Sequence, residues 1–212
     1  MSPSPSPPGR VEDTPMMRQF HAAKEQHPQA LLFFRMGDFY ELFFDDAKLA
    51  AKELGLTLTA RDKAKKVPMA GVPVRAMEGY LTRLVRAGHT VAICEQVQDP
   101  REVKGLVDRE VVRVVSPGTL VEDESLVGTE PLFVLALDLQ PPARGKTTEG
   151  WTVGLAWADL STGSFRCAEA RLDRLGEELG RIQPAEVLLP ELPDDDGSTA
   201  AAWHELCAQV AR

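Results

Sequence analysis

The sequence has few of the features that would place a protein in a membrane or outside a cell. No apolar stretch approaches the roughly 20 residues of a transmembrane helix, and Leu31–Phe34 is a short run. The first nine residues lack the basic start and apolar segment of a secretory signal; their Ser and Pro content predicts a disordered tail over residues 1–13. Three cysteines without a Cys-x-x-Cys pair argue against a disulfide framework and a structural zinc site. We therefore expect a protein of the reducing cytoplasm.

Signatures of common catalytic sites are also missing. Gly145-Lys146-Thr147 ends like a phosphate-binding P-loop, but the first glycine of that motif would fall at Gln140, and prolines fill the loop. No Gly-x-Ser-x-Gly occurs, and the four histidines lack metal-ligand spacing. Asp138 and Asp159, on neighbouring predicted strands, leave open a two-metal nuclease, although such acidic residues more often lie at the surface or in turns. We expect no catalytic residue, metal or cofactor in this chain.

Charge is unevenly distributed along the 212 residues, which suffice for one large domain or two modest ones. The net charge of −8 argues against a DNA-binding protein, because phosphate contacts need Lys and Arg. Through residue 118, however, there are 17 Lys and Arg against 15 Asp and Glu, whereas the remainder has 7 against 17. The first, mildly basic part can face a polyanion while the acidic part faces away. This asymmetry also predicts two domains.

Predicted helices and strands alternate, which indicates a mixed α/β fold. We expect helices at residues 14–27, 41–54, 75–87 and 173–180 and towards the C-terminus, and strands at residues 31–36, 56–60, 90–97, 109–115, 132–137, 152–159 and 187–189. Pro68–Pro73 is predicted to be a turn block. The polar, acidic stretch after the last strand of the first part predicts domains at 14–119 and 130–212, joined by a linker at 120–129.

The trio Phe39-Tyr40-Glu41 is the most informative segment. An aromatic ring and a carboxylate two positions apart project to the same side when the backbone is extended. That arrangement pairs a stacking surface with a hydrogen-bond acceptor, which is what probing a single base in DNA requires. Gly37-Asp38 is a turn signal, so we expect the trio where a strand gives way to a helix.

The segment that contains this trio, Leu32–Phe43, resembles the mismatch-reading segment of bacterial MutS DNA mismatch repair proteins. Three further blocks agree in order with that family: Pro68–Pro73, Val91–Gln96 and Val111–Thr119. The resemblance spans about Thr14 to Thr119 and continues more weakly through residues 130–190. It implies a mismatch-recognition domain followed by an incomplete, ribonuclease H-like α/β connector domain. It also implies minor-groove recognition of mispaired or unpaired bases in duplex DNA.

The resemblance assigns the wedge to Phe39 and a base contact to Glu41. A ring pushed into the minor groove must partly unstack a base step, which costs a few kcal/mol and less where pairing is already flawed. Stacking returns roughly 1–3 kcal/mol per base whatever its identity. Glu41 would accept a hydrogen bond from a displaced base. Its charge would repel a duplex that offers no such hydrogen bond. The alternatives are that Phe39 is a core residue and that Glu41 begins a helix, stabilised by its dipole.

Further candidates surround the trio. Met36 and Met69 would give apolar support beside Phe39, or would simply fill the core. The basic candidates for phosphate contact are Arg61, Lys63, Lys65, Lys66 and Arg113. Arg113 matches a basic residue of the family, whereas the lysines can equally form a solvated surface loop. Such contacts position a protein on DNA without reading sequence.

The resemblance also implies partners that this chain cannot engage alone. Full-length members of the family are dimeric ATPases that use ATP and Mg²⁺ and recruit MutL-type proteins, whereas this chain lacks a P-loop and the core, lever and clamp regions. We therefore expect a DNA-binding portion without enzyme activity, located in the bacterial cytoplasm with the nucleoid and away from membranes. Its partner would be double-stranded DNA with mismatches or small insertion loops. The alternative hypothesis is a docking module of the repair machinery that acts through residues 130–212.

Overall fold

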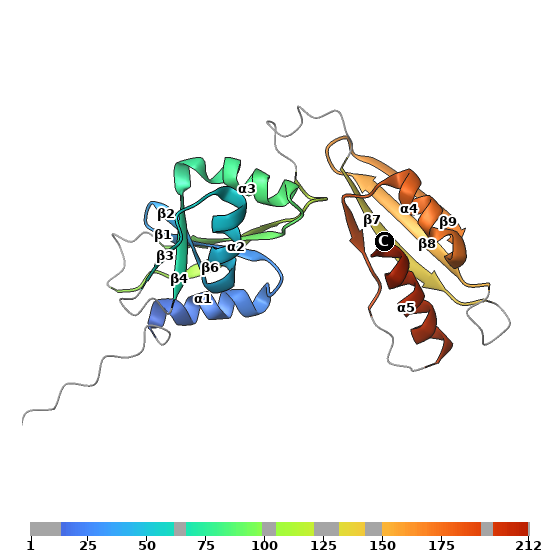
Figure 1. Ribbon diagram of the computed structural model, residues 1–212, viewed down its shortest axis with the longest axis horizontal. Helices are drawn as coiled ribbons and strands as arrows, with labels where there is room; N and C mark the ends of the chain where they lie inside the picture. The colour runs from blue at the N-terminus through green and yellow to red at the C-terminus, as the bar shows by residue number, and fades with distance from the viewer. Residues whose placement is uncertain are drawn as a thin grey trace, which may run out of the picture. The chain divides into compact units, whose positions relative to one another are not determined.

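The computed structural model describes residues 14–61, 67–98, 105–120, 132–142, 150–191 and 197–211. The chain forms two compact units that divide between Ser116 and Pro117. The elements of the first unit are α1 (Pro15–Gln26), β1 (Leu31–Met36), β2 (Phe39–Phe43), α2 (Phe44–Leu54), β3 (Thr59–Ala60), β4 (Pro68–Pro73), the 3-10 turn η2 (Val74–Ala76), α3 (Met77–Arg86), β5 (Val91–Gln96) and β6 (Arg109–Val115) (Figure 1).

The first unit is built on a six-stranded mixed sheet. Its strand order is β3-β4-β2-β1-β5-β6, and β1 runs parallel to β5 while the other neighbours are antiparallel. Helix α1 lies on one face, where Phe20 packs against Phe34 and Phe43, and helices α2 and α3 lie on the other (Figure 1). The predicted mixed α/β class is confirmed.

Helix α1 begins where the sequence predicts. Thr14 caps it by accepting a hydrogen bond from the Met17 backbone N–H at 3.3 Å, and Pro15 occupies the first turn. An ion pair then ties α1 to α2: the Lys24 ammonium lies 2.9 Å from the Asp46 carboxylate. Asp46 is buried and also accepts the Leu32 backbone N–H at 3.0 Å, so its charge is compensated twice.

Strands β1 and β2 form a tight hairpin around Gly37 and Asp38, in which Met36 pairs with Phe39. The helix predicted from residue 41 is therefore wrong at its start, because the strand continues to Phe43 and α2 begins at Phe44. The chain passes from strand to helix without a loop, and Phe44 takes a φ of 54°, a left-handed conformation that side chains disfavour.

Two other predictions for the first unit are corrected. The block Pro68–Pro73 is not a turn but strand β4, which pairs along its length with β2. Its prolines stand at the two ends of the strand, where a missing N–H is best tolerated. The strand predicted at residues 56–60 is limited to Thr59 and Ala60.

The second unit has a four-stranded sheet with the order β10-β7-β8-β9, in which β7 and β10 are parallel. Its elements are β7 (Phe133–Gln140), β8 (Thr152–Asp159), β9 (Ser164–Arg171), the 3-10 turn η4 (Leu172–Arg174), α4 (Leu175–Ile182), β10 (Glu186–Leu188) and α5 (Ser198–Val210). Leu155 and Trp157 of β8 belong to a core that also contains Leu175 of α4 and Leu206 of α5. The sequence does not predict strand β9, because nearly all of it is exposed and its apolar residues change from one face to the other between Cys167 and Ala168.

The segment that follows the first unit packs within the second. The Gly118 backbone N–H donates to the Glu186 carboxylate at 3.1 Å, and a Cβ at Gly118 would lie 2.3 Å from Val134 Cγ2. Residues 1–13 and, apart from Leu120, the predicted linker 120–129 lie outside the described residues. Among the helices that are described, none is long and apolar enough to cross a membrane.

Candidate nucleic-acid interface

Phe39 occupies the first position of β2, at the tip of the hairpin. Its backbone pairs with Met36 on one side and with Pro73 on the other, so it is held between two strands. Its side chain is 44% exposed, whereas Phe43, four residues on, is fully buried under α1. Phe39 is therefore not a core residue, and the alternative interpretation from sequence is wrong.

Glu41 lies two residues further along β2, which is extended, so Phe39 and Glu41 project from the same face of the sheet. Tyr40 lies between them and points to the opposite face, where it is 2% exposed. Because Glu41 belongs to a strand that continues to Phe43, it does not begin a helix, and that alternative is also wrong.

The Glu41 carboxyl is in an unusual electrostatic position. Its Oε2 is buried without a hydrogen-bond partner, the only such side-chain atom in the part of the chain that the structure describes. Burial raises the pKa of Glu41, and the positive charge of Arg61 lowers it in part. A buried carboxylate oxygen without a hydrogen-bond partner can accept a hydrogen bond from a bound ligand.

Arg61 and the two methionines lie beside this face. The Arg61 guanidinium is 5.8 Å from the centre of the Phe43 ring, and its Nη1 lies 3.9 Å from Met36 Sδ. Met36 and Met69 are partly buried and pack against the core under α1. Met69 pairs with Phe43 on β2, two steps beyond Glu41 and Gly71. The structure thus brings Arg61, Met36 and Met69 to the face that carries Phe39 and Glu41.

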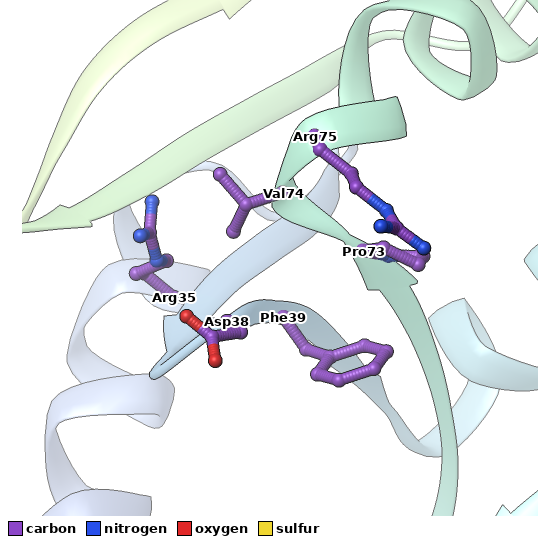
Figure 2. Close-up of a pocket in the computed structure, with 6 residues that line it drawn as sticks. All are labelled: Arg35, Asp38, Phe39, Pro73, Val74 and Arg75. Carbon is purple, nitrogen blue, oxygen red and sulfur yellow. The ribbon is translucent and has the colours of Figure 1, made fainter.

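A cavity of about 510 Å³ opens next to Phe39 (Figure 2). Its walls are formed by the hairpin and by the end of β4 with η2, through Arg35, Asp38, Phe39, Pro73, Val74 and Arg75. The Val74 backbone N–H donates to the Asp38 carbonyl at 3.0 Å, which fixes the two walls together. Arg75 is exposed and makes no ion pair or hydrogen bond within the described ranges.

The sequence does not single out Arg75 as a site residue, since it lies at the start of a predicted helix. The available signal was its position directly after the Pro68–Pro73 block, two residues beyond the proline that pairs with Phe39. A free guanidinium beside an exposed aromatic ring can contact a phosphate of the strand that the ring enters.

The hairpin is fixed from its other face. The Tyr40 hydroxyl donates a hydrogen bond to the Glu95 carboxylate of β5. The Arg35 guanidinium of β1 lies beside both, 3.4 Å from Glu95 and 5.4 Å from the centre of the Tyr40 ring. Arg35 Nε also donates to the Gly37 carbonyl at 2.6 Å. Burial, then the hydrogen bond with Glu95, raises the pKa of Tyr40 to about 12. The strand that presents Phe39 is therefore well anchored.

Arg113 does not join this cluster. Arg113 of β6 pairs with Ile93 of β5. Its guanidinium lies 3.5 Å from Glu78 of α3, on the face of the sheet opposite Phe39. Lys63, Lys65 and Lys66 lie outside the described residues, so their predicted phosphate contacts remain predictions.

The nuclease alternative conflicts with the geometry of the second unit. Asp138 pairs with Gly154, whereas Asp159 pairs with Phe133. The two aspartates are therefore five positions apart along the ladder, about 17 Å, whereas a two-metal site needs them within a few ångströms. Asp159 accepts hydrogen bonds from Ser161 and Thr162 in its own turn, and these lower its pKa.

No cluster of three or more metal-ligating His, Cys, Asp or Glu side chains occurs in the described parts of either unit. The segment Gly145-Lys146-Thr147, rejected above as a P-loop, lies outside the described residues.

Fold and site together define an α/β protein that presents an aromatic ring and a carboxylate from the tip of a rigid hairpin. Comparison with known proteins gives the family. The family model described as MutS domain I matches residues 14–124, and the one described as MutS domain II matches residues 133–208. The chain is 51% identical over 207 residues to the DNA mismatch repair protein MutS of Rhodopirellula baltica. This chain belongs to the MutS family of DNA mismatch repair proteins.

The match to the Rhodopirellula baltica protein covers 90% of this chain but 23% of the relative. The chain thus spans less than a quarter of that relative's length.

Proposed function

We propose that the first unit recognises mispaired or unpaired bases in duplex DNA from the minor groove, and that it thereby starts mismatch repair. The single observation that carries this proposal is the exposed Phe39 at the hairpin tip, with Glu41 on the same face. Phe39 would enter a base step, where a flawed pair resists unstacking less than an intact duplex does. Glu41 would accept a hydrogen bond from the displaced base.

Support for the wedge comes from how firmly Phe39 is held. β2 is paired on both sides, and Tyr40 anchors it to β5 from the opposite face. A rigid presentation matters because a mobile ring would lose conformational entropy on insertion, at the expense of affinity. Such a protein senses how easily the duplex deforms, not which sequence it has.

Phosphate contacts would set the position of the duplex. Arg75 and Arg61 flank Phe39 and Glu41 on the described part of this surface. We propose them, together with Lys63, Lys65, Lys66 and Arg113 from the sequence, as the residues that bind the backbone.

The test is the variant Phe39→Ala in the 212-residue chain, with Phe165→Ala as the control. Phe165 is 69% exposed but belongs to β9 of the second unit. Fluorescence anisotropy with a matched duplex and one with a single unpaired thymine should show that Phe39→Ala loses its preference and keeps weak, salt-dependent binding. Phe165→Ala should behave as wild type. Retention of the preference by Phe39→Ala would refute the wedge.

For the longer protein we propose the role that the family implies. The mismatch-recognition domain is assigned to residues 14–119 and the connector to residues 130–212, with a linker at 120–129. Together they form the N-terminal part of a bacterial cytoplasmic ATPase that dimerises and recruits MutL-type proteins. ATP and Mg²⁺ would bind in other regions of that protein.

A second candidate function is docking through the second unit. Four large apolar side chains there are at least 40% exposed: Leu160, Phe165, Leu188 and Leu189. Contiguous exposed apolar surface favours contact with another protein, and Leu188 and Leu189 are consecutive at the end of the edge strand β10. Pull-down of a MutL-type protein by the chain, lost in Leu188→Ser with Leu189→Ser but not in Phe39→Ala, would support docking. Equal capture by all variants would refute it.

A further inference from the structure

Gly71 lies directly opposite Glu41 in the pairing of β2 with β4. The carboxyl group of Glu41 rests against it: a Cβ built on Gly71 would lie 2.8 Å from Oε2 and 3.2 Å from Oε1 and Cδ. Real Cβ atoms do not approach an oxygen to 2.8 Å. Any side chain at position 71 therefore competes with the Glu41 carboxyl for the same space.

Close approach to a carboxylate is uncommon among the described glycines; Gly118 shares it, since a Cβ there would lie 3.0 Å from Glu186 Oε2. A Cβ at Gly79 in α3 would have no atom within 4 Å, and one at Gly154 in β8 would be 3.7 Å from Asp138, an ordinary contact. Gly71 is also not required by its backbone, since it does not have the positive φ of Gly37 or Gly55. What Gly71 supplies is room for the Glu41 carboxyl.

The space has an electrostatic consequence for Glu41. With the carboxyl lying on the bare backbone of β4, Oε2 is cut off from solvent and has no hydrogen-bond donor. This burial is the main reason why the pKa of Glu41 is raised.

We propose that Gly71 is a positioning residue, which holds the Glu41 carboxyl withdrawn against β4 and so sets how strongly the chain discriminates between flawed and intact duplex. This inference rests on the function proposed above. Withdrawn, the carboxyl repels an intact duplex less and is placed beside Phe39 when a base is displaced. A side chain at position 71 would push the Glu41 carboxylate outward, where it would repel matched and flawed duplexes equally.

The strand is expected to keep its place while the carboxyl moves. β4 pairs with β2 along its length and β2 pairs with β1, whereas the Glu41 carboxyl is the end of a flexible side chain. The Gly71→Ala variant should therefore fold with Glu41 displaced.

The first measurement follows the Glu41 side chain in the 212-residue chain without DNA. Carboxyl chemical shifts, recorded by NMR against pH, should show the pKa of Glu41 lower in Gly71→Ala than in wild type, because Oε2 becomes hydrated. Gly79→Ala and Gly154→Ala should leave it unchanged. An unchanged Glu41 pKa in Gly71→Ala would overturn the positioning role.

The second measurement is the ratio of affinities for the unpaired-thymine duplex and the matched duplex. It should fall several-fold in Gly71→Ala and stay at the wild-type value in Gly79→Ala. In a Glu41→Ala background, Gly71→Ala should leave this ratio unchanged, which separates the effect on Glu41 from a general folding defect.

The outcomes separate this inference from the function on which it rests. A shifted Glu41 pKa with an unchanged ratio in Gly71→Ala, while Phe39→Ala still loses the preference, would overturn the specificity role of Gly71 alone. A preference that survives in Phe39→Ala would refute the proposed function, whatever Gly71→Ala does to the pKa.

Discussion

Tyr40 reaches across β1 to donate its hydroxyl to Glu95, so the residue next to the exposed Phe39 is bonded to a strand two places away in the sheet. The same strand thus anchors itself through one face and presents Phe39 and Glu41 from the other. Rigid placement of this kind is what a functional side chain requires of its surroundings.

Removing that anchor should weaken the fold and the recognition together. Tyr40→Phe keeps the ring but deletes a hydrogen bond to a carboxylate, so we expect a loss of about 1.5 kcal/mol in the free energy of unfolding, measured with urea. The preference for a flawed duplex should also fall. Tyr80→Phe is the matched control, since Tyr80 makes no hydrogen bond within the described residues. Equal stabilities of the two variants would contradict the anchoring role.

The buried charge of Glu41 should make stability depend on pH. Burial raises its folded pKa above the ordinary 4.5, so its favourable contribution is complete below pH 4.5 and is lost as the pH rises through the folded value. Glu41→Gln should therefore melt at a higher temperature than wild type at pH 7, and the difference should shrink towards pH 4.5. Glu169→Gln, on exposed β9, should show no such trend. A wild type that is the more stable form at pH 7 would disprove this.

Arg75 should contribute to affinity without contributing to selectivity. Arg75→Ala is expected to weaken binding to matched and flawed duplexes by the same factor, and to reduce the slope of log affinity against log salt concentration by about 1. Anisotropy titrations at several salt concentrations measure both quantities. Arg166→Ala, which removes the same charge from exposed β9, controls for net charge. A loss confined to the flawed duplex would instead place Arg75 against a base.

The ion pair between α1 and α2 should be a major source of stability in the first unit. Asp46→Ala removes the carboxylate from the Lys24 ammonium, which keeps its hydrogen bond to the Ala30 carbonyl, and leaves the Leu32 N–H without its acceptor, so we expect a loss of about 1.5–3 kcal/mol in urea unfolding. Asp45→Ala removes the neighbouring carboxylate, which is 92% exposed, and should have little effect. Similar losses in the two variants would show that the pair adds nothing specific.

The sequence predicts the class of fold because hydrophobic periodicity and capping are local signals. Thr14, Pro15 and Gly55 mark helix ends that the structure reproduces. Their chemistry is contained within a few residues, so no knowledge of the tertiary structure is needed.

Predictions failed where pairing between distant strands decides the structure. Leu42 and Phe43 fit a helical period, and as neighbours on a strand they point to opposite faces that are both covered here; pairing with β4 selects the strand. Gly37-Asp38 was interpreted as a turn into a helix, although a glycine in the first place of a two-residue turn also signals a hairpin. The prolines and the glycine of Pro68–Pro73 are turn signals, whereas the structure places the prolines at the two ends of a strand.

The same limit applies to the candidate site. That Phe39 and Glu41 share one face follows from their spacing, once the backbone is extended. That Arg75 flanks the ring, that Gly71 underlies the carboxyl and that Arg113 faces away with Glu78 all depend on contacts between separate strands and helices. No local pattern contains that information.

The alternation along β2 makes this segment sensitive to length. Phe39 and Glu41 belong to one parity of the strand and Tyr40 and Leu42 to the other, so deleting one residue after the Gly37 turn would exchange the two sets. Tyr40 and Leu42 would then take the face that carries Phe39 and Glu41, and Phe39 and Glu41 would turn to the face on which Tyr40 and Leu42 are buried. A substitution in β2 changes one side chain. Deletion of one residue would change the face of every residue that follows in the strand, and would abolish both the fold and the recognition of flawed duplexes.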